Sequence, residues 1–299
     1  MQKKQFGRTG LEVSVLGFGS TVIGFNQTSQ SIVDRLLNAA LDCGSNVIDT
    51  AECYGSEDLI GNAISDRRQQ CFLFTKCGHN HGSGFDLENW TPRLLEFSID
   101  SSLRRLRTDY LDLIQLHTCT EDVLRQGEVI SVLQKARDAG KARLIGYSGD
   151  SAAALYAVQC GAFDALQISV NVADQEAINF VLPLAEQQGM GVIAKRPLAN
   201  VVWRRNERPD YVEGIYWDRL QKLNYNFLQS GDETDKIETA LRFTLSVPGV
   251  HTAIVGTQKL EHWQANLAAI EANNLSENDY QAIRKRWEEC AAPDWIGQG

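Results

Sequence analysis

The sequence predicts an α/β barrel of eight parallel strands, each followed by a helix. Two observations support this fold class. Short apolar runs and amphipathic segments alternate eight times, and the apolar runs lack interspersed polar residues, which is typical of parallel strands buried on both faces. The 299 residues also exceed the ~250 that one such barrel takes, so we expect a single domain over residues 1–299.

The elements can be assigned along the chain. Two short extended runs around Gly7-Arg8-Thr9-Gly10 predict a β-hairpin that closes the bottom of the barrel. The first strand is expected at Val15 to Gly19, and the first helix runs from Ser29 or Ser31 to Cys43, before the C-capping Gly44. The later strands are expected at 46–49, 71–76, 111–116, 142–147, 165–169, 191–194 and 251–255, and the helices at 57–65, 92–106, 122–139, 151–160, 175–188, 233–246 and 259–271. An extra helix is expected at 278–290.

A doubly wound open sheet is the competing architecture, because it also alternates strands with helices. The N-terminal hairpin and the eight repeats favour closure instead. The sequence therefore predicts a TIM (β/α)8 barrel with an N-terminal β-hairpin, a long loop after strand 7 and an extra C-terminal helix.

Three connections are longer than simple connectors need to be: residues 77–90, 198–231 and 291–299. Each leaves from the carboxyl ends of the strands or can reach them. The second contains six aromatic residues: Trp203, Tyr211, Tyr216, Trp217, Tyr225 and Phe227. Such a segment is either a lid or wall over a pocket, or a loop packed on itself.

Bulk composition limits the classes of function. The formal net charge is −9, which does not favour nucleic acid or anionic membranes as partners. The seven cysteines show no Cys-x-x-Cys pair and no metal-ligand spacing, so we expect reduced thiols and no metal site. The first ten residues lack a signal-peptide core, and no apolar run reaches the length of a membrane span. We therefore expect a cytoplasmic protein that acts on a small molecule.

Three consecutive predicted strands end on ionisable residues. Asp49 ends the second strand, Lys76 the third and His117 the fourth, while Tyr54 follows Asp49 at the entry to a helix. Each of them alone has an ordinary structural explanation, such as a solvated lysine or a satisfied histidine at the barrel rim. Because parallel strand ends converge on one face of a barrel, the four together indicate a reactive site.

These four residues, in this order and context, resemble the catalytic tetrad of the aldo-keto reductases. The opening segment from Phe6 to Gly19 resembles the N-terminal signature of that family. Three later segments resemble its cofactor-binding segments: residues 145–148, 194–198 and 254–257. The resemblance covers nearly the whole chain.

The resemblance implies reversible hydride transfer between a nicotinamide and a carbonyl or alcohol substrate. Tyr54 would be the general acid/base, and the nearby cation of Lys76 would make its phenol a better proton donor. Asp49 would pair with Lys76 and keep it charged and fixed. His117 would donate a hydrogen bond to the substrate oxygen and orient it.

The resemblance also implies a cofactor site along the later strand ends. Ser148 and Gln167 would hold the nicotinamide carboxamide, although Gly149 stands where the family usually has asparagine. Lys195 stands where the family commonly has a stacking tyrosine, which suggests pyrophosphate contact or a reshaped nicotinamide face. The other implied cofactor residues are Arg196, Pro197, Leu198, Gly256, Thr257, Lys259, His262 and Asn266.

The predicted cofactor is NADP(H), because Lys259 precedes the last helix of the barrel where a 2′-phosphate would bind; NAD(H) is not excluded. Aldehyde or ketone reduction is the first hypothesis. A sugar or alcohol dehydrogenase working in the oxidative direction is the second. A cofactor-binding regulatory subunit with secondary activity is the third, and the complete tetrad favours an enzyme over it.

Overall fold

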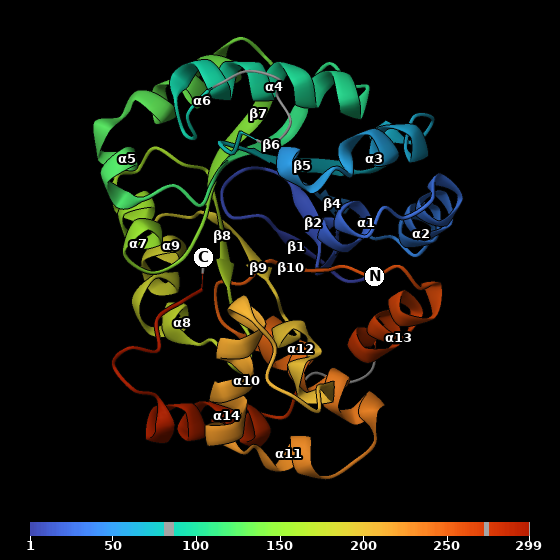
Figure 1. The fold of residues 1–299 in the computed structure, drawn as a ribbon, viewed down its shortest axis with the longest axis vertical. Helices are drawn as coiled ribbons and strands as arrows, with labels where there is room; N and C mark the ends of the chain where they lie inside the picture. The colour runs from blue at the N-terminus through green and yellow to red at the C-terminus, as the bar shows by residue number, and fades with distance from the viewer. Residues whose placement is uncertain (81–86, 272–274, 299) are drawn as a thin grey trace.

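The computed structural model describes residues 1–80, 87–271 and 275–298. Eight parallel strands form a closed barrel in the order β10-β3-β4-β5-β6-β7-β8-β9, which confirms the predicted barrel and excludes the open sheet (Figure 1). The barrel strands are β3 (Leu16–Gly19), β4 (Val47–Asp49), β5 (Phe72–Cys77), β6 (Leu111–His117), β7 (Ala142–Ser148), β8 (Ala165–Ser169), β9 (Gly191–Lys195) and β10 (Thr252–Val255).

Helices surround the barrel on the outside (Figure 1). They are α2 (Gln30–Asp42), α3 (Glu57–Ala63), α4 (Pro92–Leu106), α5 (Glu121–Gln126), α6 (Glu128–Asp138), α7 (Ser151–Gln159), α8 (Glu176–Phe180), α9 (Leu182–Gln187), α12 (Glu233–Ser246) and α13 (Leu260–Glu271). Short helical segments are α1 (Thr21–Phe25), η1 (Glu52–Tyr54) and η2 (Arg68–Gln70). These helices cover the outer face of the barrel, and the side chains of the strands fill its interior. Both faces of the sheet are therefore buried.

Two of the predicted helices are interrupted, which corrects the expectation of continuous helices at 122–139 and 175–188. The first is split between α5 and α6 at Gly127. Its φ of 78° lies in the left-handed region, which glycine adopts at little steric cost. The second is split between α8 and α9 at Val181. Pro183 follows in the first turn of α9, where its missing N–H leaves no helical bond unmade.

The hairpin of β1 (Lys3–Gln5) and β2 (Glu12–Ser14) closes the bottom of the barrel, as predicted. Phe6, at its turn, is fully buried and stacks on Phe74 of β5 with ring centroids 5.7 Å apart. The remaining buried members of this lower core are Leu11, Val13, Val47, Leu113, Ala165 and Ile193. The lower end of the barrel is therefore a packed apolar core.

The predicted long loop after strand 7 is largely helical, which corrects that expectation. It contains η3 (Ala199–Arg204), α10 (Tyr211–Leu223) and α11 (Asn226–Gln229). Tyr216 is buried and donates a hydrogen bond to Asp174 Oδ2 at 3.1 Å, while Tyr211 is 89% exposed. Its aromatic residues thus do not form one continuous wall, since some are anchored inward and others face solvent.

The extra C-terminal helix is present as α14 (Glu277–Cys290), beside α10 in Figure 1. Arg286 of α14 donates to the carbonyl oxygens of Lys222 and Leu223, which ties the two helices together. The tail after α14 then returns toward β8. Of the long connection at 77–90, residues 81–86 lie outside the described part of the chain. No helix in the described residues is both long and apolar enough to cross a membrane.

Candidate active site

The four residues of the predicted tetrad lie together at the carboxyl ends of the first strands. Asp49 ends β4, Lys76 lies one residue before the end of β5, and His117 ends β6. Tyr54 is held by the short helix η1, which follows β4 directly. Asp49 and Lys76 are essentially inaccessible, His117 is 9% exposed, and Tyr54 is partly exposed. A phenol open to the barrel mouth therefore sits over a buried pair of charges.

Lys76 and Asp49 form a short buried ion pair. The Lys76 Nζ atom lies 2.6 Å from Asp49 Oδ1 and also donates to the Thr50 carbonyl at 2.8 Å. It lies 5.1 Å from the centroid of the Tyr54 ring. Burial has the largest single effect and lowers the pKa of Lys76, but the charge of Asp49, its hydrogen bond and the other neighbouring groups together raise the pKa above the ordinary value. The lysine is thus a fixed cation beneath the tyrosine.

His117 packs against the same tyrosine. The rings of Tyr54 and His117 are 5.7 Å apart and nearly perpendicular. Burial, and then the positive charge of Lys76, hold the pKa of His117 well below its ordinary value, so the imidazole is neutral near pH 7. Its Nδ1 atom lies 3.6 Å from Cys53 Sγ. A neutral imidazole can still donate one N–H hydrogen bond to an oxygen.

The tetrad is linked directly to two of the predicted cofactor residues. Gln167 donates from Nε2 to Asp49 Oδ2 at 2.8 Å, and Ser148 Oγ donates to Gln167 Oε1 at 3.0 Å. All three side chains are about 1% exposed. A chain of hydrogen bonds therefore runs from the charged pair to the ends of β7 and β8.

The end of β9 carries two cations with different partners. Lys195 pairs with Asp150 at 2.8 Å, and its pKa is lowered by burial, which the charge of Asp150 only partly offsets. Arg196 follows it and donates to Ser169 Oγ at 3.1 Å. Within the described residues, no carboxylate lies within ion-pair distance of Arg196. The segment continues through the buried Pro197 and the partly buried Leu198.

The last strand-to-helix turn provides a different kind of surface. Gly256 is exposed, and a Cβ atom there would lie 2.6 Å from the Gly19 carbonyl oxygen, so the close approach of the segments after β3 and β10 requires glycine. Thr257 Oγ1 accepts from the Lys259 N–H at 3.0 Å at the start of α13. Lys259 and His262 are exposed, whereas Asn266 is buried. This turn thus combines backbone N–H groups with a cation, the chemistry that phosphate groups require.

Several residues around the site escaped the sequence analysis. Glu52 Oε1 accepts from the His79 N–H at 2.7 Å, and burial raises the pKa of Glu52 to about 7. The His79 ring is 4.7 Å from that of His117. Asp150, which pairs with Lys195, was missed as well. The position of Glu52 two residues before Tyr54 was the one available signal, because the other contacts join distant segments.

In the part of the chain that the structure describes, no three His, Cys, Asp or Glu side chains come together as ligands for a metal ion. The ionisable groups at the barrel mouth are instead bonded to one another or to amides and hydroxyls. The donor set fits a nicotinamide cofactor: a hydroxyl and an amide near the ends of β7 and β8, two cations at the end of β9, and a helix N-terminus with a lysine after β10.

Comparison with known proteins identifies the family. The sequence profile of the Aldo/keto reductase family matches residues 15–288. The chain is 30% identical to the NADH-specific methylglyoxal reductase of Escherichia coli (strain K12), over 96% of this chain and 99% of that protein. It is 26% identical to an uncharacterized oxidoreductase of Bacillus subtilis (strain 168), over 95% and 96%.

A solved structure of an aldo-keto reductase from Bacillus halodurans, in its holo form, matches with a TM-score of 0.85 at 28% identity, over 99% of both chains. The fold, the profile match over most of the chain and the oxidoreductase relatives agree. The chain therefore belongs to the aldo/keto reductase family and is an NAD(P)H-dependent oxidoreductase acting on carbonyl groups.

Proposed function

We propose that this enzyme reduces small aldehydes or ketones with NADP(H), and that Tyr54 is the general acid. The observation that carries the proposal is the buried Lys76–Asp49 pair beneath the ring of Tyr54, beside a neutral His117. A structural explanation for one buried ion pair is easy to give. An ion pair that supports a partly exposed phenol at the mouth of a barrel is better explained by proton transfer.

The roles of the four residues follow from where charge develops. A bound nicotinamide supplies the hydride that adds to the carbonyl carbon, which leaves negative charge on the oxygen. Tyr54 donates its proton to that oxygen, and the fixed cation of Lys76 stabilises the phenolate that results. Asp49 keeps Lys76 charged and in place. The neutral His117 donates its N–H to the same oxygen and so orients the carbonyl.

The cofactor contacts are proposed on the same residues as in the sequence analysis. Ser148 and Gln167 hold the carboxamide, and Lys195, Arg196, Pro197 and Leu198 flank the nicotinamide and the diphosphate. The turn from Gly256 and Thr257 through Lys259, His262 and Asn266 receives the adenosine half. The exposed Lys259 supports a preference for NADP(H), while the NADH-specific relative makes NAD(H) the alternative to be tested.

The substrate proposal extends the name of one relative. Because the methylglyoxal reductase of Escherichia coli matches over almost its whole length, 2-oxoaldehydes are the first substrates to try. Glyceraldehyde, simple aliphatic aldehydes and aromatic aldehydes complete a panel that varies size and polarity. L-Galactose with NADP⁺ or NAD⁺ would test the oxidative alternative, since an L-galactose dehydrogenase is among the relatives.

The deciding experiment follows NADPH absorbance with the purified protein and this panel, then repeats the best substrate with Tyr54→Phe. We expect kcat to fall about 10²–10⁴-fold, the usual contribution of a general acid, while NADPH affinity changes little. Tyr211→Phe is the matched control, because this tyrosine is 89% exposed on α10. Turnover retained by Tyr54→Phe would contradict the assigned role. Tight NADPH binding without turnover of any carbonyl would favour a regulatory subunit instead.

A further inference from the structure

We propose that the C-terminal segment Ile296–Gln298, called here the C-terminal strap, positions Arg196 to bind the diphosphate of the cofactor. This inference rests on the proposed function, because it assumes that a dinucleotide binds at the ends of β7, β8 and β9. It assigns a role in cofactor binding to a tail that has no catalytic residue of its own. The argument starts from how the strap is held.

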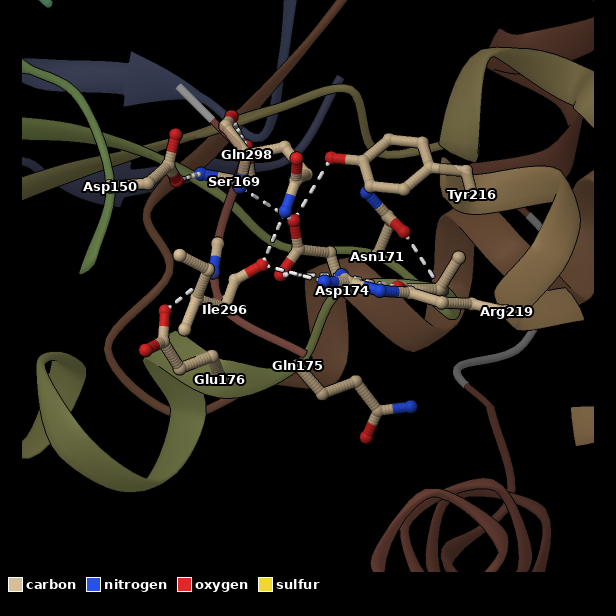
Figure 2. A network of polar contacts seen from close by, with 12 residues as sticks. Asp150, Ser169, Asn171, Asp174, Gln175, Glu176, Tyr216, Arg219, Ile296 and Gln298 are labelled. Carbon is tan, nitrogen blue, oxygen red and sulfur yellow. Dashed lines mark hydrogen bonds and ion pairs between the residues drawn. The ribbon is translucent and has the colours of Figure 1, made fainter. Parts of the chain in front are cut away.

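Buried and partly buried side chains bind most of the main-chain polar groups of the strap (Figure 2). The Gln298 N–H donates to Asp174 Oδ2 at 3.2 Å, and the Gln298 carbonyl accepts from both Arg196 Nη1 and Ser169 Oγ. The contacts of the two preceding residues are Gly297 N–H to Glu176 Oε2 at 2.6 Å, Ser151 Oγ to the Gly297 carbonyl at 3.2 Å, and Arg219 Nη2 to the Ile296 carbonyl at 2.7 Å. The strap is therefore held through its main-chain N–H and C=O groups, as an extended peptide is held in a binding groove.

The strap crosses three strand ends next to the proposed cofactor residues. Ser148 ends β7, and Asp150 packs against the strap two residues later. Gln167 lies in β8, and Ser169 bonds to the strap two residues later. Arg196 immediately follows Lys195 of β9. Residues two apart at a strand end point to the same side. The strap therefore lies beside the strand ends that carry the groups proposed to hold the nicotinamide.

Among the residues that hydrogen-bond to the strap in these contacts, only Arg196 is also proposed to bind the cofactor. Arg196 donates to the Ser169 hydroxyl and to the Gln298 carbonyl, and the phenol of Tyr216 also interacts with it; all three groups are neutral. The charged groups around it are already paired: Asp150 with Lys195, and Asp174 with Arg219 at 3.7 Å. Burial raises the pKa of Asp174 to about 7, so this carboxyl is a weak counter-ion near neutral pH. A largely buried guanidinium held by neutral acceptors is suited to bind an anion.

The strap is better described as a fixed support than as a plug that the cofactor displaces. Displacement would strand several buried donors and acceptors, each at a cost of about 1–3 kcal/mol. The backbone approach is also very close at Gly297, where a Cβ atom would lie 2.9 Å from Asp150 Cβ and 3.0 Å from Glu176 Oε2. A side chain at this position would push the strap away from Arg196.

The test compares Gly297→Val, Arg196→Met and the double variant by titrating NADPH against intrinsic tryptophan fluorescence. We expect each single variant to weaken NADPH binding about tenfold, and the double variant to lose no more than Arg196→Met alone, because the strap acts through that arginine. ADP-ribose, which keeps the diphosphate, should lose affinity in parallel. Adenosine 2′-monophosphate, which lacks it, should not.

Controls separate this effect from loss of fold. Asp294→Asn changes an exposed residue of the same tail and should bind NADPH as the wild type does. A chain that ends after Trp295 removes the strap without a clash and should match Gly297→Val, with melting curves confirming that both are folded. If the wild type binds no nicotinamide nucleotide, the proposed function fails.

Other outcomes overturn the strap inference alone. Unchanged NADPH affinity in Gly297→Val would show that the strap is not needed, and tighter binding would show that it competes with the cofactor. Losses that multiply in the double variant would show that the strap and Arg196 act independently. A rise in KM confined to an anionic carbonyl substrate, with NADPH affinity unchanged, would assign Arg196 to the substrate instead.

Discussion

The two ends of the barrel are built by the same strands with opposite chemistry. On β5, Phe74 points into the lower core and stacks on Phe6, and two residues later Lys76 points into the upper end and pairs with Asp49. On β6, Leu113 lies in the lower core and His117 faces the catalytic mouth. The side chains change from apolar to ionisable over two residues on β5 and four on β6, and each pair of residues advances the strand by about 7 Å.

This difference between the two ends indicates that the lower end mainly stabilises the fold, while the upper end carries the groups proposed for the reaction. The lower end is sealed by the apolar hairpin side chains Phe6, Leu11 and Val13, which need only close packing. The upper end buries charges that are tolerated because each has a specific partner, and this makes it sensitive to loss of a single group. Variants of Lys76 and Phe74, neighbours on one strand, therefore test whether the two ends are as separate as they look.

The largest effect is expected for Lys76→Met. It leaves the buried Asp49 carboxylate without its cation, which typically costs about 3–5 kcal/mol of unfolding free energy. Carbonyl turnover should also be nearly abolished, because the cation that would stabilise the negative charge left on Tyr54 after proton transfer is gone. Urea unfolding and steady-state kinetics measure the two effects.

The double variant Lys76→Met/Asp49→Asn sharpens this prediction. Removing both charges should restore most of the unfolding free energy, since no unpaired charge remains buried. It should not restore turnover, because the cation next to Tyr54 is still missing. Recovery of activity together with stability would show that Lys76 serves the fold and not the chemistry.

Phe74→Ala should show the opposite pattern at the other end of the strand. Loss of a fully buried ring typically costs about 3–5 kcal/mol, through lost transfer energy and the cavity that is left. Because the change lies in the lower core, kcat and NADPH affinity of the folded fraction should stay near wild type. Thermal unfolding and steady-state kinetics below the transition measure both. A large loss of kcat in fully folded protein would mean that the lower core also sets the tetrad geometry.

The same contrast explains what the sequence could and could not predict. The strands were recognisable because an apolar run is local, and the meeting of the four residues proposed as the tetrad was predictable because each stands at or near a strand end. The breaks at Gly127 and Val181 were missed because the apolar pattern of each helix continues across them. The helical content after β9 was missed because dense aromatic residues in a long connection suggested a loop.

The contacts among the residues proposed to bind the cofactor join segments that are distant in the sequence. Nothing near Lys195 in the sequence indicates that it pairs with Asp150. The tail was noted as able to reach the catalytic face, but its docking on Ser169 and Arg196 spans more than 100 residues of sequence. Such pairings are fixed by tertiary packing and leave no periodic pattern in the chain.

The smallest effect is expected for Lys259→Ala, which tests whether the enzyme prefers NADP(H) or NAD(H). Lys259 is exposed at the start of α13, and it is proposed to contact the 2′-phosphate that distinguishes NADP(H) from NAD(H). The neighbouring Glu261 lies two residues on, which turns it away from the face of Lys259 on a helix. A charged hydrogen bond to phosphate contributes about 1.5–3 kcal/mol, roughly a ten- to hundredfold change in affinity.

Because solvent screens this exposed lysine, we expect a loss near tenfold for NADPH and almost none for NADH. Dissociation constants from tryptophan fluorescence quenching measure both, and raising the salt concentration should narrow the difference between variant and wild type. Lys285→Ala, which removes an equally charged exposed lysine from α14, is the matched control. Equal losses for NADPH and NADH would place Lys259 on a part shared by the two nucleotides. A wild-type enzyme that prefers NADH would instead extend to this chain the NADH specificity of its Escherichia coli relative.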